Sequence, residues 1–271
     1  MEGFPLLAIE ELRGTLQTAY IGKTLLYHPT LDSTNTLAMD LIRQPPQGGG
    51  QQATEGTVVL TDHQPGGRGR QGRQWRSLPG QQILLSIVVF PSFSMPYLVM
   101  CAALAVREAI AQTTKLSPAI KWPNDVLLAG KKICGILIET TSGPDNRWCA
   151  VVGIGLNVSG SFKEDHELAE RATSIAEQGV SGIRRETLIA ALLHRFEEHY
   201  LQLQYNGAEG ARQVWNGWRE HLATLGRRVR IQQGERIIEG VASDVEADGA
   251  LLVRQDDGTT AQIHWGDVHL L

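Results

Sequence analysis

The sequence predicts an α+β fold in which a mixed β-sheet is packed with helices. Apolar, β-branched runs separated by turn signals predict strands of one sheet at 57–60, 83–90, 125–128, 132–140 and 149–158. The helical patterns are grouped between and after these runs, which favours α+β over strict βαβ alternation. From Leu222 onward, short strands separated by glycine-containing turns are typical of a small SH3-like β-barrel.

Two domains are expected along the chain. Its 271 residues allow one large domain and a small one. The change of pattern at Leu222 assigns 1–221 to the large domain and 222–271 to the small C-terminal domain. The short strands of the small domain are expected at 227–232, 237–246, 250–255 and 260–271.

Helices are expected at 6–16, 33–43, 96–112, 186–204 and about 208–221. Asp32 or Ser33 can cap the second of these, and Ser94 lies near the start of the third. The third is rich in apolar residues, so we expect it to pack under the sheet. The segment 43–56 contains prolines and a run of glycines, which predict a flexible surface loop.

The composition is that of an ordinary water-soluble globular protein. Hydrophobic residues make up 42%, charged residues 20%, and the mean hydropathy is −0.15. No apolar run is long enough to span a membrane, and no basic start followed by an apolar run marks an export signal. A net charge of −4 argues against general nucleic-acid binding, which needs a widespread basic surface.

Three cysteines lie in separate apolar segments. Cys101, Cys134 and Cys149 form no CxxC pair and no His/Cys cluster at metal-ligand spacing. We therefore expect core thiols, no protein-bound metal, and a reducing cytoplasmic location.

The stretch GGRGRQGRQW, 66–75, interleaves glycines with arginines and ends in a tryptophan. Its glycines let backbone N–H groups turn inward, and Arg68, Arg70 and Arg73 carry planar guanidinium groups that bind phosphate or carboxylate bidentately. Trp75 offers a flat face for stacking. The pattern favours a loop that closes over a polyanion, ordered by its ligand. A disordered RNA-contacting segment or a solvated basic turn is the alternative.

The second cluster is IKWPNDVLLAGKKICGILIE, 120–139. Asn124 and Asp125 can present their side chains in the turn after Pro123. Lys132 precedes a strand interrupted by Gly135, and a strand glycine often marks the close approach of a ligand. The alternative is a hairpin with a polar turn and solvated lysines.

Two weaker motifs flank these clusters. GIGLNV, 153–158, fits a strand that lines a pocket and presents Asn157 to a base edge or hydroxyl, or else a bulge in a core strand. DSTN, 32–35, places polar groups at a helix start, where ordinary N-capping is the alternative. The eight histidines fall outside all four clusters, so no Ser/His/Asp or Cys/His nucleophile is indicated. The residues favour binding and alignment of charged reactants, as in phosphoryl or adenylyl transfer.

Together, in this order and spacing, these segments resemble the biotin protein ligase family. The matching strings are STN at 33–35, HQPGGRGRQGRQW at 63–75, KWPNDV at 121–126, KKICGILIE at 131–139, GIGLNV at 153–158 and ATSI at 172–175. The resemblance implies a catalytic domain like that of class II aminoacyl-tRNA synthetases, followed by the small β-domain. It also implies an ATP-dependent enzyme that uses Mg²⁺, makes biotinyl-5′-AMP, and transfers biotin to a lysine of a biotin carboxyl carrier protein.

The resemblance also implies roles for individual residues. Biotin would be bound by Ser33, Thr34, Asn35, Gln64, Arg68, Gly69, Arg70, Lys132 and Gly135. The catalytic cations would be Arg68, Arg70 and Lys132, with Lys132 at the reacting carboxylate and α-phosphate. The nucleotide would contact Arg73, Trp75, Asn124, Asp125 and Asn157. No protein ligand is assigned to Mg²⁺, for which Asp125 is the nearest candidate.

One departure from some relatives concerns DNA binding. Those relatives carry an N-terminal helix-turn-helix domain, whereas here about thirty residues with one good helix precede DSTN, so we expect a monofunctional ligase that does not bind nucleic acid or membranes. A lipoate or octanoate ligase of the same fold, and a non-catalytic nucleic-acid-binding regulator, are the weighed alternatives. The carrier is expected to be the acetyl-CoA carboxylase subunit. A monomer and a homodimer both remain open.

Overall fold

The computed structural model describes residues 4–43, 53–143 and 147–271. Most of the predicted surface loop at 43–56 lies outside these residues. The elements of the large part are α1 (Ile9–Thr15), β1 (Leu25–Thr30), α2 (Thr34–Arg43), β2 (Val58–His63), the 3₁₀ turn η1 (Arg70–Gly72), β3 (Gln82–Val89), α3 (Met95–Thr114), β4 (Ala119–Lys121), β5 (Asp125–Leu128), β6 (Lys131–Ser142), β7 (Trp148–Asn157), η3 (Ala176–Gln178), α4 (Arg185–Tyr205) and α5 (Gly207–Glu220).

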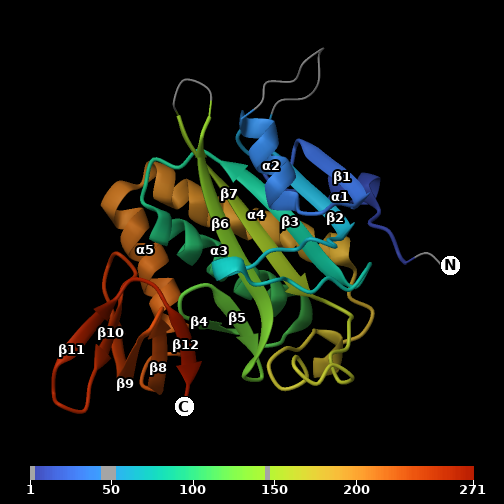
Figure 1. Cartoon of the computed structure of the whole chain (residues 1–271). Helices are drawn as coiled ribbons and strands as arrows, with labels where there is room; N and C mark the ends of the chain where they lie inside the picture. The colour runs from blue at the N-terminus through green and yellow to red at the C-terminus, as the bar shows by residue number, and fades with distance from the viewer. Residues whose placement is uncertain (1–3, 44–52, 144–146) are drawn as a thin grey trace.

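These strands form one sheet in the order β1-β2-β3-β7-β6-β5-β4. Only β1 and β2 pair in parallel, and every other neighbouring pair is antiparallel, so the predicted mixed sheet is confirmed. Figure 1 shows α3 and α4 behind the central strands and α2 in front of them. The predicted packing of the apolar helix under the sheet is confirmed, because α3 contributes much of the main core cluster.

Strand β3 shows how the sheet separates two environments. It is buried along its whole length. Ile83, Leu85, Ile87 and Val89 belong to the core with α3 and α4, whereas Val88 packs with α2 in a smaller cluster. Because side chains alternate along a strand, Ser86 faces the same side as Val88. The same alternation on β7 puts Gly153 and Gly155 on that front side, where the sheet is not fully covered by α2.

The C-terminal part is a second, antiparallel sheet. It consists of β8 (Arg228–Gln233), β9 (Arg236–Val245), β10 (Leu251–Arg254), β11 (Thr260–Ile263) and β12 (Asp267–Leu270), in the order β11-β10-β9-β8-β12. Figure 1 shows it beside β4 and β5. Backbone hydrogen bonds connect the two parts: Ile120 N–H donates to His221 O, and Ala223 N–H to Ile120 O, both at 2.8 Å.

The structure corrects several sequence-based boundaries. The single strand predicted at 260–271 is two strands, because the chain turns at Gly266, whose φ of 142° favours glycine, and β11 and β12 lie at opposite edges of the sheet. Strands β1 and β4 were not predicted. The helix predicted at 6–16 is shorter, Ile9–Thr15.

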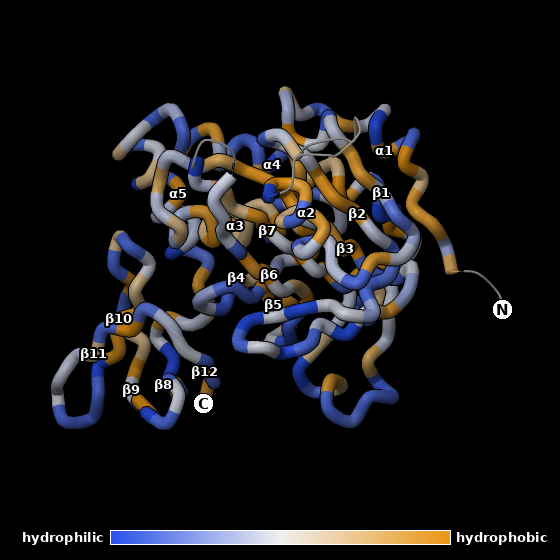
Figure 2. The backbone as a smooth tube through the Cα atoms, turned by 45° about the horizontal axis from the view of Figure 1, so that its top comes forward, coloured by the Kyte–Doolittle hydropathy of each residue, from blue (hydrophilic) through white to orange (hydrophobic). Residues whose placement is uncertain are grey.

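The predicted core thiols are confirmed. Cys101, Cys134 and Cys149 are buried and free. Figure 2 shows apolar segments among the central strands and hydrophilic segments in the outer loops. Among the described residues, no helix is both long and apolar enough to cross a membrane.

Candidate active site

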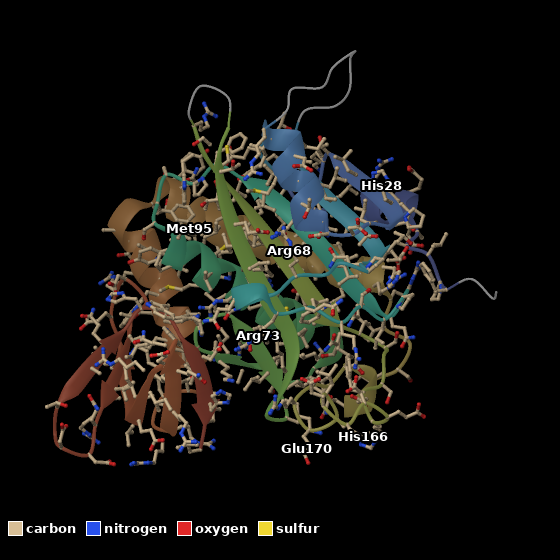
Figure 3. All side chains as sticks on the ribbon, viewed as in Figure 1. His28, Arg68, Arg73, Met95, His166 and Glu170 are labelled. Atoms are coloured by element: carbon tan, nitrogen blue, oxygen red, sulfur yellow. The ribbon has the colours of Figure 1, made fainter. Side chains whose placement is uncertain are left out.

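A cavity of about 470 Å³ opens on the front face of the large sheet. It lies where the start of α2, the arginine loop, the β4–β5 hairpin, β6, β7 and β12 meet. Of the fourteen residues assigned by resemblance, thirteen line it: Ser33, Thr34, Asn35, Gln64, Arg68, Gly69, Arg70, Arg73, Trp75, Asn124, Asp125, Lys132 and Gly135. Figure 3 shows Arg68 and Arg73 on the loop that crosses this face. The structure thus brings four distant motifs to one place.

One end of the cavity is a buried network of neutral polar groups. Gln64 Oε1 accepts hydrogen bonds from the backbone N–H of Thr34 at 2.7 Å and from its hydroxyl at 3.0 Å. Ser86 Oγ lies 2.7 Å from Thr34 Oγ1 and 2.6 Å from Asn35 Oδ1. Ser33 also caps α2, because its Oγ accepts from the Thr36 N–H at 3.4 Å. The DSTN motif therefore both caps α2 and contributes residues to the cavity wall.

Arg68 joins this network through a carboxylate. Its guanidinium donates to Glu139 Oε2 at 2.9 Å and to Thr36 Oγ1 at 3.1 Å. Asn35 Nδ2 donates to the same Glu139 oxygen at 2.8 Å. Glu139 therefore holds the guanidinium of Arg68 and the amide of Asn35 next to each other.

The arginine loop has a defined backbone in the structure. Gly69 N–H donates to Arg73 O at 2.7 Å, and Trp75 N–H donates to Gly67 O at 2.9 Å. A side chain on Gly67 would place its Cβ 2.6 Å from Trp75 O, so this close approach requires glycine. The loop is thus folded back on itself and aims its arginines into and around the cavity.

Trp75 lies flat over two glycines that face each other across β6 and β7. Gly135 and Gly155 are paired in register. A Cβ on Gly155 would lie 2.6 Å from the Trp75 indole, and one on Gly135 would lie 3.0 Å from it. The strand glycines therefore make room for the indole. The indole Nε1 is buried and has no hydrogen-bond partner within the described residues, so an acceptor that entered the cavity would stabilise it.

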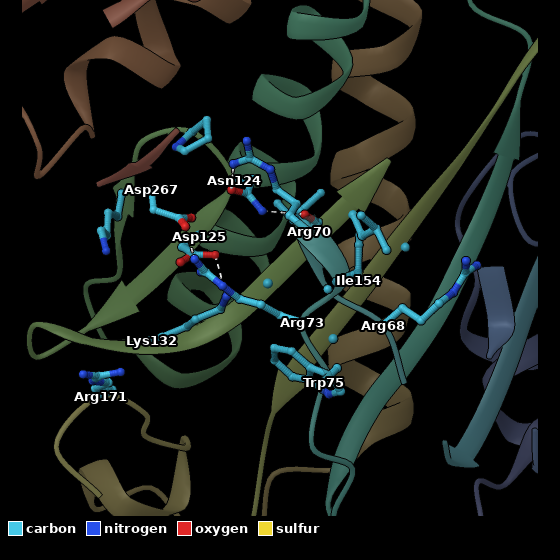
Figure 4. Close-up of a pocket in the computed structure, with 18 of the residues that line it drawn as sticks. Arg68, Arg70, Arg73, Trp75, Asn124, Asp125, Lys132, Ile154, Arg171 and Asp267 are labelled. Atoms are coloured by element: carbon cyan, nitrogen blue, oxygen red, sulfur yellow. Dashed lines mark hydrogen bonds and ion pairs between the residues drawn. The ribbon is translucent and has the colours of Figure 1, made fainter. Parts of the chain in front are cut away.

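The opposite end of the cavity is charged, as Figure 4 shows. Lys132 Nζ lies 2.7 Å from Asp125 Oδ1, and Arg70 Nη1 donates to Asn124 Oδ1 at 2.7 Å. Arg73 pairs with Asp267 of β12. The six cationic side chains in the wall are Arg68, Arg70, Arg73, Lys121, Lys132 and Arg171, and the three carboxylates are Asp125, Glu170 and Asp267. The excess of positive charge favours an anionic ligand.

Burial reinforces this preference. It lowers the pKa of Arg70 below its ordinary value, although the carboxylates of Asp125 and Asp267 oppose the shift. A lowered arginine pKa means that the charged form loses hydration in the cavity. A bound anion would restore favourable interactions to that charge.

Several lining residues were missed by the sequence analysis. Arg171 reaches the cavity from the 159–175 loop, which is held to β6 because Lys132 N–H donates to Arg171 O at 2.8 Å. Asp267 and Lys121 were also missed. Ser86, which does not line the cavity but hydrogen-bonds to Thr34 and Asn35, was also missed, and its only sequence signal was a polar residue inside an otherwise apolar strand.

Asn157 does not line the cavity. It is buried at 3% exposure, and both ends of its amide are used: Gln82 Nε2 donates to its Oδ1 at 2.8 Å, and its Nδ2 donates to Thr173 O at 2.9 Å. Asn157 therefore connects β7 to Gln82 and to the segment at Thr173. Its predicted nucleotide contact is unsupported by this placement.

The described residues contain no cluster of three or more His, Cys, Asp or Glu side chains that could hold a metal ion. Asp125, the candidate ligand of Mg²⁺, is paired with Lys132. The cavity wall is formed by more cationic than carboxylate side chains.

Comparisons with known proteins define the class to which this fold and cavity belong. Residues 27–157 match the biotin/lipoate A/B protein ligase family, and residues 224–271 match the biotin protein ligase C-terminal domain. The chain is 32% identical over 268 residues to the bifunctional ligase/repressor BirA of Bacillus subtilis, covering 97% of this chain and 79% of that protein. The chain therefore belongs to the biotin protein ligase family.

Two further comparisons agree. The biotin–[acetyl-CoA-carboxylase] ligase of Mycobacterium tuberculosis is 33% identical over 222 residues, which cover 79% of each protein. The structure of the Aquifex aeolicus biotin protein ligase in complex with biotin and ATP superimposes with a TM-score of 0.76 at 27% identity. It covers 92% of this chain and 99% of that one. The family resemblance and the fold class predicted from the sequence are both confirmed.

Proposed function

We propose that this protein is an ATP-dependent ligase that activates biotin as biotinyl-5′-AMP and transfers the biotinyl group to one lysine of a biotin carboxyl carrier protein. The observation that carries the proposal is a single cavity with a neutral hydrogen-bonding end and a cationic end. The relative from Mycobacterium tuberculosis is named a biotin–[acetyl-CoA-carboxylase] ligase, and the solved relative from Aquifex aeolicus holds biotin and ATP.

The neutral end would bind the ureido ring of biotin. Thr34, Asn35 and Gln64 present buried hydroxyl and amide groups there. A site built from such groups discriminates strongly against ligands that leave them unpaired. This chemistry supports biotin over the plain hydrocarbon chain of octanoate.

The cationic end would stabilise the adenylation step. A carboxylate oxygen of biotin attacks the α-phosphorus of ATP, and negative charge builds between two anions that repel each other. Lys132 and Arg70 both line the cavity and would hold fixed positive charge beside the reacting groups. Such preorganised charge lowers the barrier because it need not reorganise during the reaction. Closure of the loop would shield the mixed anhydride from water until the carrier lysine attacks it and AMP leaves.

Mg²⁺ would enter with ATP as part of the substrate. It commonly binds through substrate phosphates and water, with only one or two carboxylates from the protein. When bound, the ion would neutralise part of the charge on the phosphates.

Other expectations about the whole protein remain proposals. We propose that residues 1–221 and 222–271 act as a catalytic and a C-terminal domain, that the carrier is the acetyl-CoA carboxylase subunit, and that the ligase works in the cytoplasm as a monomer or homodimer without nucleic acid. The start of β8 at Arg228 supports the boundary. The buried free thiols of Cys101 and Cys134 support a reducing compartment.

The experiment that tests the function is exchange of labelled pyrophosphate into ATP with biotin, lipoate or octanoate. Exchange with biotin alone is expected. Exchange with lipoate or octanoate instead would overturn the proposed substrate and favour a lipoate-type ligase. With biotin established, transfer to a purified carrier domain tests the second step, and a carrier lysine replaced by arginine is its control.

A further inference from the structure

Ser86 is a buried hydroxyl on β3 for which the proposed reaction so far gives no role. Its exposed fraction is 0%, and the strand around it is apolar apart from Gln82 at its start. Ser86 does not line the cavity, but its Oγ lies 2.7 Å from Thr34 Oγ1 and 2.6 Å from Asn35 Oδ1, and both of these residues do line it. Ser86 therefore lies one hydrogen bond behind the polar end of the site.

The orientation of the Asn35 amide decides where the proton of Ser86 goes. Asn35 Nδ2 donates to Glu139 Oε2 at 2.8 Å and to Leu137 O at 3.3 Å, and a carboxylate and a carbonyl oxygen only accept. Asn35 Oδ1 is therefore the atom that faces Ser86. Because an amide oxygen carries no proton, the hydrogen bond across the 2.6 Å contact uses the hydroxyl proton of Ser86.

The proton of the Thr34 hydroxyl has two acceptors within reach. They are Ser86 Oγ at 2.7 Å and Gln64 Oε1 at 3.0 Å, and one hydroxyl proton serves one of them well. Gln64 Oε1 already accepts from the backbone N–H of Thr34 at 2.7 Å, whereas Ser86 Oγ has no other donor within the described residues. Since the proton of Ser86 is used by Asn35, the proton of Thr34 is drawn to Ser86.

This order of protons determines what the polar end offers to a ligand. Thr34 and Gln64 line the cavity, and with the Thr34 proton directed to Ser86 their side-chain oxygens are acceptors. A ligand that brings an N–H group to Thr34 Oγ1 gains a hydrogen bond. A ligand with an oxygen in the same place brings two acceptors together with no proton between them, which costs free energy in a desolvated site.

We propose that Ser86 is a positioning residue that sets the specificity of the site, because it takes the hydroxyl proton of Thr34 and thereby makes Thr34 an acceptor for a ring N–H of the ligand. This inference rests on the proposed function, since the ureido ring of biotin carries two N–H groups. Ser86 itself lies outside the cavity wall. It acts on the ligand through Thr34.

The test measures discrimination between ligands, which a merely structural role would leave unchanged. Calorimetry compares the binding of biotin with that of its two cyclic carbamate analogues, in each of which oxygen replaces one ring N–H. The wild type is expected to bind the analogue with oxygen opposite Thr34 about a hundredfold more weakly than biotin. In S86A the Thr34 hydroxyl is free to turn and donate to that oxygen, so this ratio should fall by about tenfold.

The second analogue and two further variants are the controls. For the analogue with oxygen at the other ring position, the ratio in S86A should stay within about twofold of the wild type. S86C, which keeps a weaker hydrogen-bonding group of similar size, should give an intermediate ratio. T61V removes a buried hydroxyl from the neighbouring strand β2 and should discriminate like the wild type, because Thr61 Oγ1 bonds to the backbone of His63 and not to Thr34.

Three results would overturn the role of Ser86. They are a wild type that binds both analogues as tightly as biotin, an S86A variant that changes the ratios for both analogues equally or for neither, and a T61V variant that changes them as S86A does. Failure of the proposed function would look different, because the wild type itself would then neither bind biotin nor show biotin-dependent pyrophosphate exchange.

Discussion

Arg70 shows how a single side chain connects the loop to the opposite wall of the cavity. Its guanidinium donates to Asn124 Oδ1 at 2.7 Å, and Asn124 is itself fixed because its Nδ2 donates to Ile136 O at 2.7 Å. The loop is thereby fastened across the cavity to the hairpin and to β6. An intermediate below Arg70 would be both neutralised and covered.

We therefore expect R70G to release biotinyl-5′-AMP before transfer. The loss of one charged hydrogen bond and of the side chain that covers the site should raise the release rate by about tenfold or more. Because the free adenylate acylates any exposed amine, bystander proteins mixed with the variant should become biotinylated, which streptavidin blotting measures. R76G is the control, since Arg76 pairs with Asp165 and does not line the cavity. Equal bystander labelling by R70G and the wild type would contradict this role.

At the scale of the element, β7 carries two glycines that serve opposite ends of the site. A Cβ on Gly153 would lie 2.3 Å from Asn35 Oδ1, whereas one on Gly155 would lie 2.6 Å from the Trp75 indole. Both distances are too short for an unchanged neighbour. The same small substitution at the two positions therefore disturbs two different partners.

This geometry predicts that a matched pair of variants affects two different substrates. G153A should raise the KM for biotin and G155A the KM for ATP, each by about tenfold, because overpacking a tight contact costs about 1–3 kcal/mol. Each variant serves as the control for the other in steady-state kinetics with both substrates. A rise of both KM values in both variants would indicate general distortion of β7 and contradict the separation of the two ends.

Gln82 connects the end of the arginine loop to the sheet. Its Oε1 accepts from Leu78 N–H at 3.0 Å, and its Nε2 donates to Arg76 O at 3.2 Å and to Asn157 Oδ1 at 2.8 Å. With an exposure of 1%, it has no access to replacement partners in solvent. One amide thus fixes both the loop and the Asn157 side chain behind the cavity wall.

Replacing this amide with a carboxylate should loosen the loop. Q82E removes two donated hydrogen bonds and places a buried charge against two acceptors, so a loss of about 1–3 kcal/mol in the free energy of unfolding is expected. Urea unfolding measures that loss, and trypsin, which cleaves after the arginines of the loop, should cut the folded variant faster. Q81E is the control, because Gln81 contributes its backbone to hydrogen bonds with Val158 and Ser159. Unchanged cleavage would refute the role of Gln82 in holding the loop.

The elements that the sequence predicted well are those with a strong periodic signal. The apolar runs that became β3 and β7, and the apolar helix α3, lie within a few residues of their predicted positions. Strands β1 and β4 were missed because β1 is a largely exposed edge strand that contains Pro29, and β4 has only three residues. These two strands form because they pair with other strands, which the local sequence pattern does not reveal.

In the candidate site, too, residues within sequence motifs were predicted, and residues that only the fold brings to the cavity were not. Residues within motifs, such as Thr34 and Lys132, were brought to the cavity as the resemblance implied. Asp267 was not found, because it reaches the cavity only through the position of β12 beside the large sheet. Asn157 shows a related difference: alternation puts it on the front face of β7, but its amide is hydrogen-bonded to Gln82 and Thr173 and does not line the cavity, so its contact with the nucleotide stays a prediction.

At the scale of the whole molecule, β4 joins the two sheets. Trp122 follows this strand, is 2% exposed, and its indole Nε1 donates to Gly249 O at 2.8 Å in the C-terminal part. Because β12 also contributes to the cavity wall, the two parts meet at the active site. The C-terminal sheet thereby supplies Asp267, the partner of Arg73, to the cavity wall.

Behind the large sheet, α3 and α4 are joined by an acid-sensitive contact. His199 Nε2 of α4 lies 3.0 Å from Glu108 Oε2 of α3. Burial alone would raise the pKa of Glu108, but the hydrogen bond with His199 and the charge of Arg195 lower it below its ordinary value of 4.5. The folded protein therefore releases this proton more readily than the unfolded chain does. The stabilisation is complete above about pH 4.5 and is lost as the pH falls through the folded pKa.

E108Q should remove this pH-dependent part of the stability. At pH 7 the variant is expected to unfold with a free energy lower by about 1 kcal/mol, the size of a partly exposed ion pair, and the gap should close as the pH falls from about 4.5 towards 3. Urea unfolding of both proteins at a series of pH values measures the gap. E198Q is the control for loss of a surface carboxylate, since Glu198 pairs with Arg195 at the i, i+3 spacing on α4 alone. A gap between the wild type and E108Q that stays constant down to pH 3 would show that Glu108 does not join the helices through its charge.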